Sequence, residues 1–305
     1  MRSSGTVFCL ASGTAFGGMA IFAKLAYGEG ATVGTLLSVR FAFAAVLFWV
    51  LVFARAGARE LLALSGRDLR AGLALGACGY ALQSGCYFAA LQRIDASILS
   101  LLLYTFPAIV AAAAVALGRE RMTRRRLAAL VLASGGLALV VTGAGAGSLE
   151  PLGVALGLAA ALVYSTYILV SDGVAGRISP LLLSALVCTG AAVSLCAGAA
   201  LLGQLRPGRL SAGGWGWLAC VAVVSTVIAI SLFFAGLRRV GPTTASILST
   251  VEPVVTVVLA FLVFGERLGP VQVGGGVLVL SAVLVLNLPR IEAVGKRAAP
   301  AQARA

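Results

Sequence analysis

The sequence predicts an all-α integral membrane protein with ten transmembrane helices, arranged as two inverted five-helix repeats. The chain is 60% hydrophobic and 11% charged, whereas an average soluble domain is about half apolar and about a quarter charged. Apolar stretches of about 18 residues or more recur along the whole chain, and each is long enough to cross a bilayer as a helix. A segment of the first half also aligns without a gap on a segment of the second half.

The apolar stretches give the positions of the predicted helices, separated by short polar breaks. The predicted spans are residues 5–26, 33–53, 71–91, 96–117, 127–142, 152–170, 180–202, 215–237, 243–264 and 271–288. A glycine-rich linker follows the fifth span. We therefore expect a first repeat at residues 1–143, a linker at 144–150, a second repeat at 151–289 and a basic tail at 290–305. Transmembrane β-strands would alternate in polarity, and these stretches do not.

The internal repeat pairs residues 88–121 with residues 234–267 at a constant offset of 146. The identical positions that apolar composition alone does not easily explain are Arg93 with Arg239, Pro107 with Pro253, and Glu120-Arg121 with Glu266-Arg267. An odd number of spans in each copy places the second copy upside down in the membrane. Folds of this kind bind their substrate near the middle of the bilayer, between the repeats.

The positive charge is concentrated outside the predicted spans. The net charge is +13, and seventeen Lys and Arg residues fall on the side of the N-terminus against four on the other side. This asymmetry predicts a cell inner membrane protein with both termini in the cytoplasm. No soluble basic domain is present, so we expect a small-molecule substrate and membrane lipid as partners, and no nucleic acid. The sequence leaves open whether the chain forms a homodimer.

Enzyme chemistry finds little support in the sequence. There is no histidine, and none of the six cysteines has the spacing of a metal site. Serine-type and metal-type intramembrane proteases need histidine, and all three aspartates fall in predicted loops. We therefore predict no catalytic residue, no metal and no cofactor.

Glu252 lies in the middle of the predicted ninth span and is followed by Pro253. A charged carboxylate at that depth costs about 2–3 kcal/mol or more, so it predicts a functional site. Proline removes a backbone donor and loosens the helix. Pro107 takes the equivalent place in the first repeat, and both prolines are predicted kinks with a role in gating. The alternative is that Glu252 is only a structural hydrogen-bonding group.

Other polar and aromatic side chains on the spans complete the predicted substrate site. The predicted substrate-binding residues are Phe16, Arg40, Tyr80, Gln83, Tyr87, Tyr104, Tyr164, Ser246 and Glu252. Tyr80, Gln83 and Tyr87 recur at helical spacing, so they share one helix face. A basic and an acidic group in one pocket suit a zwitterion, and tyrosines suit a planar ligand. For any single one of these residues, ordinary packing is the alternative.

Residues near the span ends carry two further predictions. Lys24 is expected to extend its ammonium toward the membrane surface, and Glu120 and Glu266 are expected to form ion pairs with nearby arginines.

Glycine pairs at four-residue spacing predict close helix approach. These pairs are Gly13/Gly17, Gly72/Gly76 and Gly153/Gly157.

Several short motifs together resemble those of a known family. The motifs are Arg40-Phe41 followed by Ala44 and Ala45, the TFP…GRER and VEP…FGER spans, and Ile178-Ser179-Pro180. The sequence is similar to the EamA family of the drug/metabolite transporter superfamily, and it resembles the aromatic amino acid exporters of that superfamily. The resemblance implies a ten-helix bundle with a central cavity lined by the first, third, fourth, sixth, eighth and ninth helices. Where the family often has Trp-Gly in the first helix, this chain has Phe16-Gly17.

These observations predict a secondary transporter that exports small metabolites such as amino acids by alternating access. Coupling to protons through Glu252 is a further hypothesis. One alternative is an importer or facilitator of a vitamin, a nucleotide-like compound or a cofactor precursor. An intramembrane enzyme and a structural scaffold are more distant alternatives.

Overall fold

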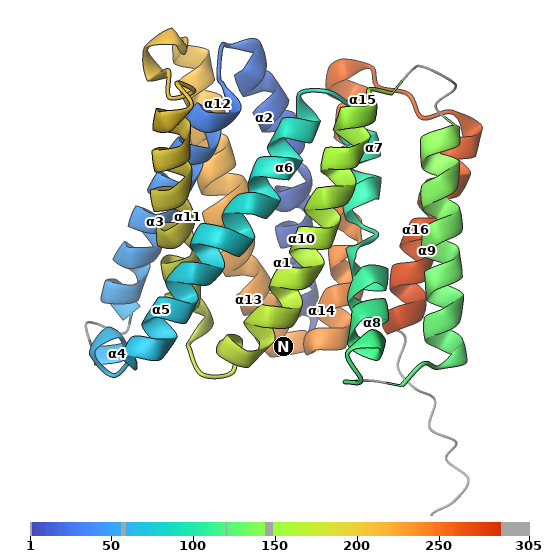
Figure 1. Ribbon diagram of the computed structural model, residues 1–305, viewed down its shortest axis with the longest axis horizontal. Helices are drawn as coiled ribbons and strands as arrows, with labels where there is room; N and C mark the ends of the chain where they lie inside the picture. Colours follow the sequence, from blue (N-terminus) through green and yellow to red (C-terminus); the bar gives the residue numbers. More distant parts are fainter. Residues whose placement is uncertain (1, 56–58, 120, 144–148, 288–305) are drawn as a thin grey trace, which may run out of the picture.

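The computed structural model describes residues 2–55, 59–119, 121–143 and 149–287, and within these ranges every regular element is a helix. The helices stand side by side and run between two faces of the molecule (Figure 1). We call the face where α1 begins the N-terminal face, and the other the opposite face. The predicted all-α class is confirmed.

The crossing segments are continuous helices or pairs of helices that follow each other closely. In chain order the helices are α1 (Arg2–Gly17), α2 (Met19–Gly28), α3 (Val33–Arg55), α4 (Arg59–Leu62), α5 (Gly66–Ala74), η1 (Leu75–Tyr80), α6 (Ala81–Leu91), α7 (Ala96–Leu103), α8 (Phe106–Ala116), α9 (Arg124–Thr142), α10 (Pro151–Ala175), α11 (Pro180–Leu201), η2 (Pro207–Arg209), α12 (Ala212–Ala222), η3 (Val223–Ile228), α13 (Ala229–Val240), α14 (Pro242–Ser249), α15 (Val251–Phe264) and α16 (Pro270–Asn287).

Nine helical segments of the described chain are long and apolar enough to cross a membrane. They correspond to every predicted span except residues 71–91. That segment, formed by α5, η1 and α6, also runs from one face to the other in Figure 1. It carries Gln83 and Ser84 near its middle. The predicted number of ten spans is therefore not confirmed by length and hydropathy.

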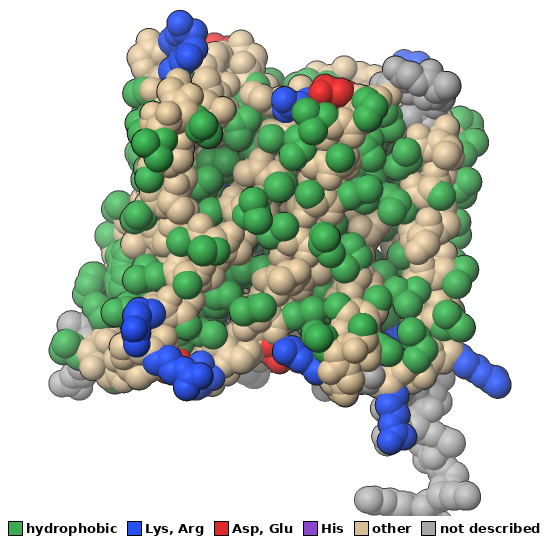
Figure 2. Space-filling model, viewed as in Figure 1, with side chains coloured by type: hydrophobic (Ala, Val, Ile, Leu, Met, Phe, Trp, Pro, Cys, Tyr) green, Lys and Arg blue, Asp and Glu red, His purple; other side chains and the backbone are tan. Residues whose placement is uncertain are grey.

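The outer surface matches a membrane environment. Hydrophobic side chains cover the middle of the visible face, and the Lys, Arg, Asp and Glu side chains gather at its two edges (Figure 2). Large apolar side chains such as Val46, Leu162 and Leu262 are more than half exposed. Exposed apolar surface on this scale marks a membrane or protein contact. The chain is a multi-pass membrane protein.

The two halves of the chain cross the molecule in opposite directions. α1 starts at the N-terminal face, whereas α10, which opens the second half, starts at the opposite face (Figure 1). This is the inverted arrangement that an odd number of crossings per half requires. The predicted linker residues 144–148 and the tail from residue 288 lie outside the described residues.

Both halves break their fourth crossing helix in the same way. α7 gives way to α8 at Tyr104 and Thr105, and α14 gives way to α15 at Thr250. Pro107 and Pro253 lie in the first turns of α8 and α15, where a missing backbone N–H removes no intrahelical bond. At each break a threonine hydroxyl donates to the carbonyl three residues earlier, at 2.7 Å. Both prolines thus lie beside interruptions of the helix.

A second irregularity also occurs in both halves. The third crossing helix of each half contains a π-helical segment, η1 in the first and η3 in the second. With the repeat offset of 146, residues 75–80 correspond to 221–226, which overlap η3. Segments of this kind are rare and are often found at functional sites. Tyr80 ends η1 and Thr226 lies in η3.

The helices pack as two groups, and each group contains helices of both halves. In the first group α1 and α2 pack against α12, α13, α14 and α15. In the second group α10 and α11 pack against α5, η1, α6, α7 and α8. α3 lies between the groups and packs on α11 of the second group and on α12 of the first, α7 packs on α15, and α9 packs on α16 at one side.

All three predicted glycine pairs lie at close helix contacts. A Cβ atom added at these glycines would overlap or press on neighbouring side-chain or backbone atoms of Val251 and Val255 for Gly13/Gly17, Leu186 and Val187 for Gly72/Gly76, and Ile94 and Leu102 for Gly153/Gly157. The prediction of close packing is confirmed. Because small residues let backbones approach, they allow helix association where lipid gives no hydrophobic driving force.

Gly190 of α11 offers a test of this packing. A Cβ atom there would lie 2.9 Å from Ala77 N and 3.0 Å from Leu73 C. Gly190→Ala is expected to destabilise the protein by about 1–3 kcal/mol, because the backbone cannot move aside cheaply. Gly198→Ala on the same helix meets nothing within 4 Å and is the matched control. Thermal unfolding in detergent measures both, and equal melting temperatures would contradict this packing account.

Candidate substrate site

Arg40 is the most buried charged group of the described chain, with 2% of its surface exposed. It projects from α3, and its Nε donates to Thr226 Oγ1 in η3 at 3.0 Å. The guanidinium also lies over the rings of Phe41 and Phe88, at 4.7 and 5.2 Å from their centroids. Within the described residues Arg40 forms no salt bridge. Its charge is thus held by the hydroxyl groups of Thr226 and Tyr80 and by two rings, and by no carboxylate of the described residues.

Glu252 lies in the first turn of α15, immediately after the helix break. Tyr104 OH lies 2.9 Å from Glu252 Oε2 and 2.8 Å from the Ser249 carbonyl oxygen, so the phenol can donate its hydrogen to either. A negative charge is favoured at this place because the N-terminus of a helix carries partial positive charge. The acid is half-buried. α1 covers one side of it, since Gly13 and Gly17 pack on the first turn of α15.

A series of aromatic rings connects the surroundings of Arg40 with those of Glu252. Adjacent rings in this series have centroids between 4.8 and 6.2 Å apart, within the range typical of favourable ring pairs. We call it the aromatic chain, and its members in order are Phe41, Tyr80, Tyr167, Tyr164, Phe106 and Tyr104. The Arg40 guanidinium lies over the Phe41 ring at one end of the aromatic chain, and Tyr104 at the other end donates to Glu252. The opposite charges therefore border one shared region.

Most of the predicted site residues come together there. Arg40, Tyr80, Tyr87, Tyr104, Tyr164 and Glu252 are the predicted residues that this region contains. Gln83 is buried one turn after Tyr80 and accepts a hydrogen bond from Ser84 Oγ. Phe16 is half-buried in α1, and no hydrogen bond or ring pair joins it to the region in the described chain. Ser246 belongs to α14, and its side chain lies outside the described residues.

The sequence prediction omitted several residues of this region. Thr226 and Tyr167 are polar residues on crossing helices, but nothing in the sequence shows that they touch Arg40 and Tyr80. Phe106 is apolar, and the available signal was its alignment with Glu252. The family resemblance implied a cavity that the second crossing helix does not line. Arg40 nevertheless comes from α3, which is that helix. The second helix therefore contributes to this region.

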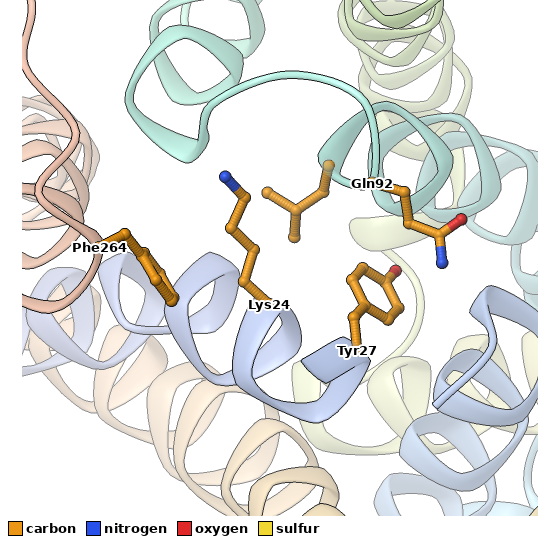
Figure 3. A pocket seen from close by; sticks show the side chains of 5 residues that line it. Lys24, Tyr27, Gln92 and Phe264 are labelled. Carbon is orange, nitrogen blue, oxygen red and sulfur yellow. The ribbon is translucent and has the colours of Figure 1, made fainter. Parts of the chain in front are cut away.

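Two pockets open at the opposite face, and neither is lined by Arg40 or Glu252. The larger has a volume of about 520 Å³ and is lined by Lys24, Tyr27, Leu91, Gln92 and Phe264 (Figure 3). The smaller has a volume of about 310 Å³ and lies between the 31–33 and 202–206 loops. We call the larger one the outer pocket.

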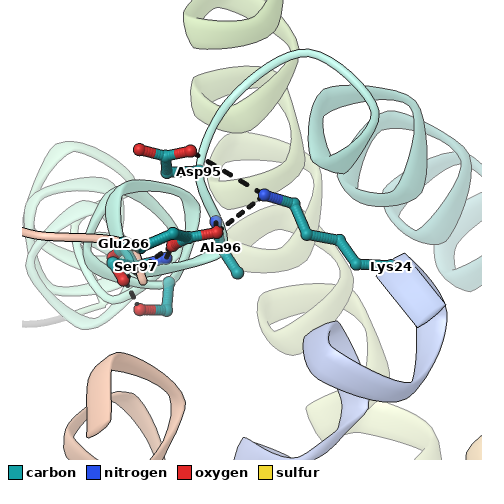
Figure 4. Close-up of polar contacts among 6 residues, drawn as sticks. Lys24, Asp95, Ala96, Ser97 and Glu266 are labelled. Carbon is teal, nitrogen blue, oxygen red and sulfur yellow. Dashed lines mark hydrogen bonds and ion pairs between the residues drawn. The ribbon is translucent and has the colours of Figure 1, made fainter. Parts of the chain in front are cut away.

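Lys24 lines the outer pocket and also forms an ion pair with Glu266, with Nζ 2.7 Å from Oε1 (Figure 4). Glu266 accepts hydrogen bonds from the backbone N–H groups of Ala96 and Ser97, at 3.1 and 3.0 Å, and from Ser97 Oγ at 2.8 Å. Asp95 Oδ1 lies 3.8 Å from Lys24 Nζ. Lys24 therefore extends toward the opposite face, and Glu266 forms the expected ion pair, but its partner is Lys24 and not a neighbouring arginine. Glu120, the repeat partner of Glu266, lies outside the described residues.

The two carboxyl groups of this cluster are shifted in opposite directions. Burial alone would raise the pKa of Glu266, but hydrogen bonds from Lys24 and Ser97 and the charge of Lys24 hold it below its usual value. Burial and the neighbouring charge of Glu266 raise the pKa of Asp95, and Lys24 only partly offsets them. A lowered pKa means that Glu266 stays ionised at neutral pH, as the ion pair requires.

Comparison with known proteins gives a consistent result over most of the chain. The model of the EamA-like transporter family matches residues 3–142 and 151–288. A protein of Bacillus subtilis strain 168, named uncharacterized transporter YcbK, is 28% identical over 287 residues, covering 90% of this chain and 89% of that protein. An uncharacterized transporter of Archaeoglobus fulgidus is 30% identical over 274 residues, covering 90% and 93%. A crystal structure that is 20% identical shares the fold, with a TM-score of 0.63 over 94% of this chain and 97% of that one.

Proposed function

The chain belongs to the EamA-like transporter family, whose model matches both of its halves, and on this premise we propose that it is a secondary transporter that exports small metabolites such as amino acids. The family and the named relatives are transporters, so the chain is a membrane transporter and not an enzyme. A transporter of this family acts on a small-molecule substrate within a lipid bilayer. What we propose beyond this is the substrate class, the direction of transport and the coupling of transport to protons.

The unpaired charge of Arg40 is the observation that carries the proposal. A guanidinium that is 2% exposed and has no carboxylate partner in the described chain is costly unless a ligand supplies the missing charge. A substrate carboxylate would bind there through charge-assisted hydrogen bonds. Glu252 would take the substrate's amino group, and the aromatic chain between them would contact an apolar or planar substituent.

Glu252 is also the proposed site of proton coupling. It is half-buried, its hydrogen-bond donor is the neutral phenol of Tyr104, and no cation pairs with it in the described residues. An intramembrane acid without a cationic partner is suited to take up and release a proton. A proton and the substrate's amino group would then compete for one carboxylate. This competition would couple the movement of protons across the membrane to the movement of the substrate.

The proposed orientation in the membrane rests on the charges of the loops. We place the N-terminal face in the cytoplasm of a cell with an inner membrane, because Lys and Arg of the loops are concentrated there. The second candidate is an importer or facilitator of a vitamin, a nucleotide-like compound or a cofactor precursor. It is favoured only by the stacked tyrosines Tyr164 and Tyr167, which also suit a heterocyclic ring.

Reconstitution into liposomes tests the proposal. Purified protein is expected to carry radiolabelled amino acids across the bilayer in counterflow, faster than empty liposomes, and an opposing pH gradient is expected to drive accumulation. Vitamins and nucleosides form the comparison panel. Counterflow with those compounds and none with any amino acid would replace the first candidate by the second. Assays with both orientations of the pH gradient distinguish export from import.

A further inference from the structure

The Lys24–Glu266 cluster connects the two groups of helices across the opposite face. Lys24 lies on α2, and Glu266 follows α15, so both belong to the first group. Asp95, Ala96 and Ser97 stand at the start of α7 in the second group. The cluster thus contains the Lys24–Glu266 ion pair within the first group, and the longer Lys24–Asp95 ion pair and three hydrogen bonds that cross between the groups. We call this arrangement the outer latch.

Other contacts close the same face. Tyr27 OH donates to the Phe88 carbonyl oxygen at 3.0 Å, which links α2 to α6 across the groups. α15 packs against α7. The repeat equivalent of this helix pair is α8 with α14 at the N-terminal face, and in the described residues these two make no comparable packing. At the opposite face α15 therefore packs directly on α7, a contact between the groups that α8 and α14 do not match among the described residues.

The outer pocket lies above this closure. Its lining combines Lys24 and Tyr27 of α2, Leu91 and Gln92 of the α6 end, and Phe264 of α15 (Figure 3). The same lysine that lines the pocket holds Glu266 against the start of α7 (Figure 4). Only 6% of the Glu266 side chain is exposed, so the latch is partly shielded from water and salt. Breaking it would separate α7 from α15 at the base of the pocket.

We propose that the outer latch, in which Lys24 holds Glu266 on the N-terminus of α7, keeps the opposite face closed and must release for the central region to open there. This inference rests on the proposed alternating-access function and assigns one of its gates. Loss of the ion pair shifts the population toward the state open at the opposite face, because only the closed state makes these contacts. When the opposite face opens, the N-terminal face closes, because the two groups of helices move as rigid bodies.

Hydrogen–deuterium exchange of the full-length protein in lipid nanodiscs tests the proposal. Glu266→Gln and Lys24→Met are compared with the unaltered chain. The exchange rate is expected to rise about fivefold or more in peptides from residues 84–94 and 256–264, and to fall by a similar factor in α8 and α14. A fivefold change corresponds to a modest coupling free energy between two sites. Lys24→Met leaves the Glu266 carboxylate to accept from Ala96 and Ser97, so it separates the ion pair from simple loss of a helix cap.

Glu29→Gln is the matched control. Glu29 is also a carboxylate of the opposite face, and it accepts a hydrogen bond from Ser211, the N-cap residue of α12. This contact joins α2 to α12 within the first group, so exchange at both faces is expected to stay unchanged. Exchange that rises only at residues 95–97, with α8 and α14 unaffected, overturns the latch. A reciprocal change in a protein that carries no tested solute supports the latch and removes the proposed function.

Discussion

Glu252→Gln is expected to lower proton-driven transport by tenfold or more, within the range of about 5- to 150-fold that typical coupling energies give. The amide has the size of the acid and can still accept the hydrogen bond from Tyr104, so the helix break and its packing should persist. It cannot bind or release a proton, and it cannot neutralise an amino group. Proteoliposomes with an imposed pH gradient measure the effect as the ratio of driven to undriven flux.

The control for this substitution is Glu150→Gln. Glu150 is an exposed acid before α10 that pairs with Arg93 at 3.1 Å, away from the aromatic chain. Its removal should leave the flux ratio unchanged, because an exposed ion pair contributes little. If Glu252→Gln retains the full pH dependence of the unaltered protein, the coupling hypothesis is wrong, and the acid is then a structural partner of Tyr104.

Arg40→Met is expected to raise the KM for a carboxylate substrate by about tenfold or more, since one charge-assisted hydrogen-bonded pair is worth about 1.5–3 kcal/mol. The melting temperature should not fall substantially, because exchanging a buried charge for an apolar group of similar length is often neutral or stabilising. The combination of lost transport and retained stability is what distinguishes a substrate-binding arginine from a structural one.

Two related variants narrow the interpretation of that result. Arg40→Lys keeps the charge but not the planar fork, so it should retain part of the affinity. Thr226→Val removes the one hydroxyl that holds Nε while leaving the charge in place, and it should have a smaller effect than Arg40→Met. A fall in melting temperature with Arg40→Met, at an unchanged KM for every transported solute, would contradict the assignment.

The fold was predictable because its signals are local or repeated. Apolar length gave the crossing helices, and glycine pairs gave several of their contacts. Pro107 and Pro253 marked the two helix breaks, because proline fits the first turn of a helix and not its interior. The segment at residues 66–91 is harder to identify as a membrane span from its hydropathy. It carries the polar residues Gln83 and Ser84, which a helix surrounded by other helices can accommodate, and they lower its mean hydropathy.

The site was predictable in its residue types and not in its partners. Glu252 and Arg40 stood out because charges are rare within spans. That Thr226 holds Arg40 depends on α3 meeting η3, a contact between residues 186 positions apart. The outer latch was missed for the same reason. Lys24 and Glu266 lie 242 positions apart, and the sequence offered nearer arginines to pair with Glu266.

The duplicated π-helical segments have a consequence for the changes in length that the third crossing helices tolerate. A π turn is an α-helix that holds one additional residue, and η1 and η3 lie at overlapping repeat positions. Deleting one residue from Leu75–Tyr80 should therefore restore a regular helix while α5 and α6 keep their present faces. The same deletion in a regular helix such as α11 would turn every later residue by about 100°.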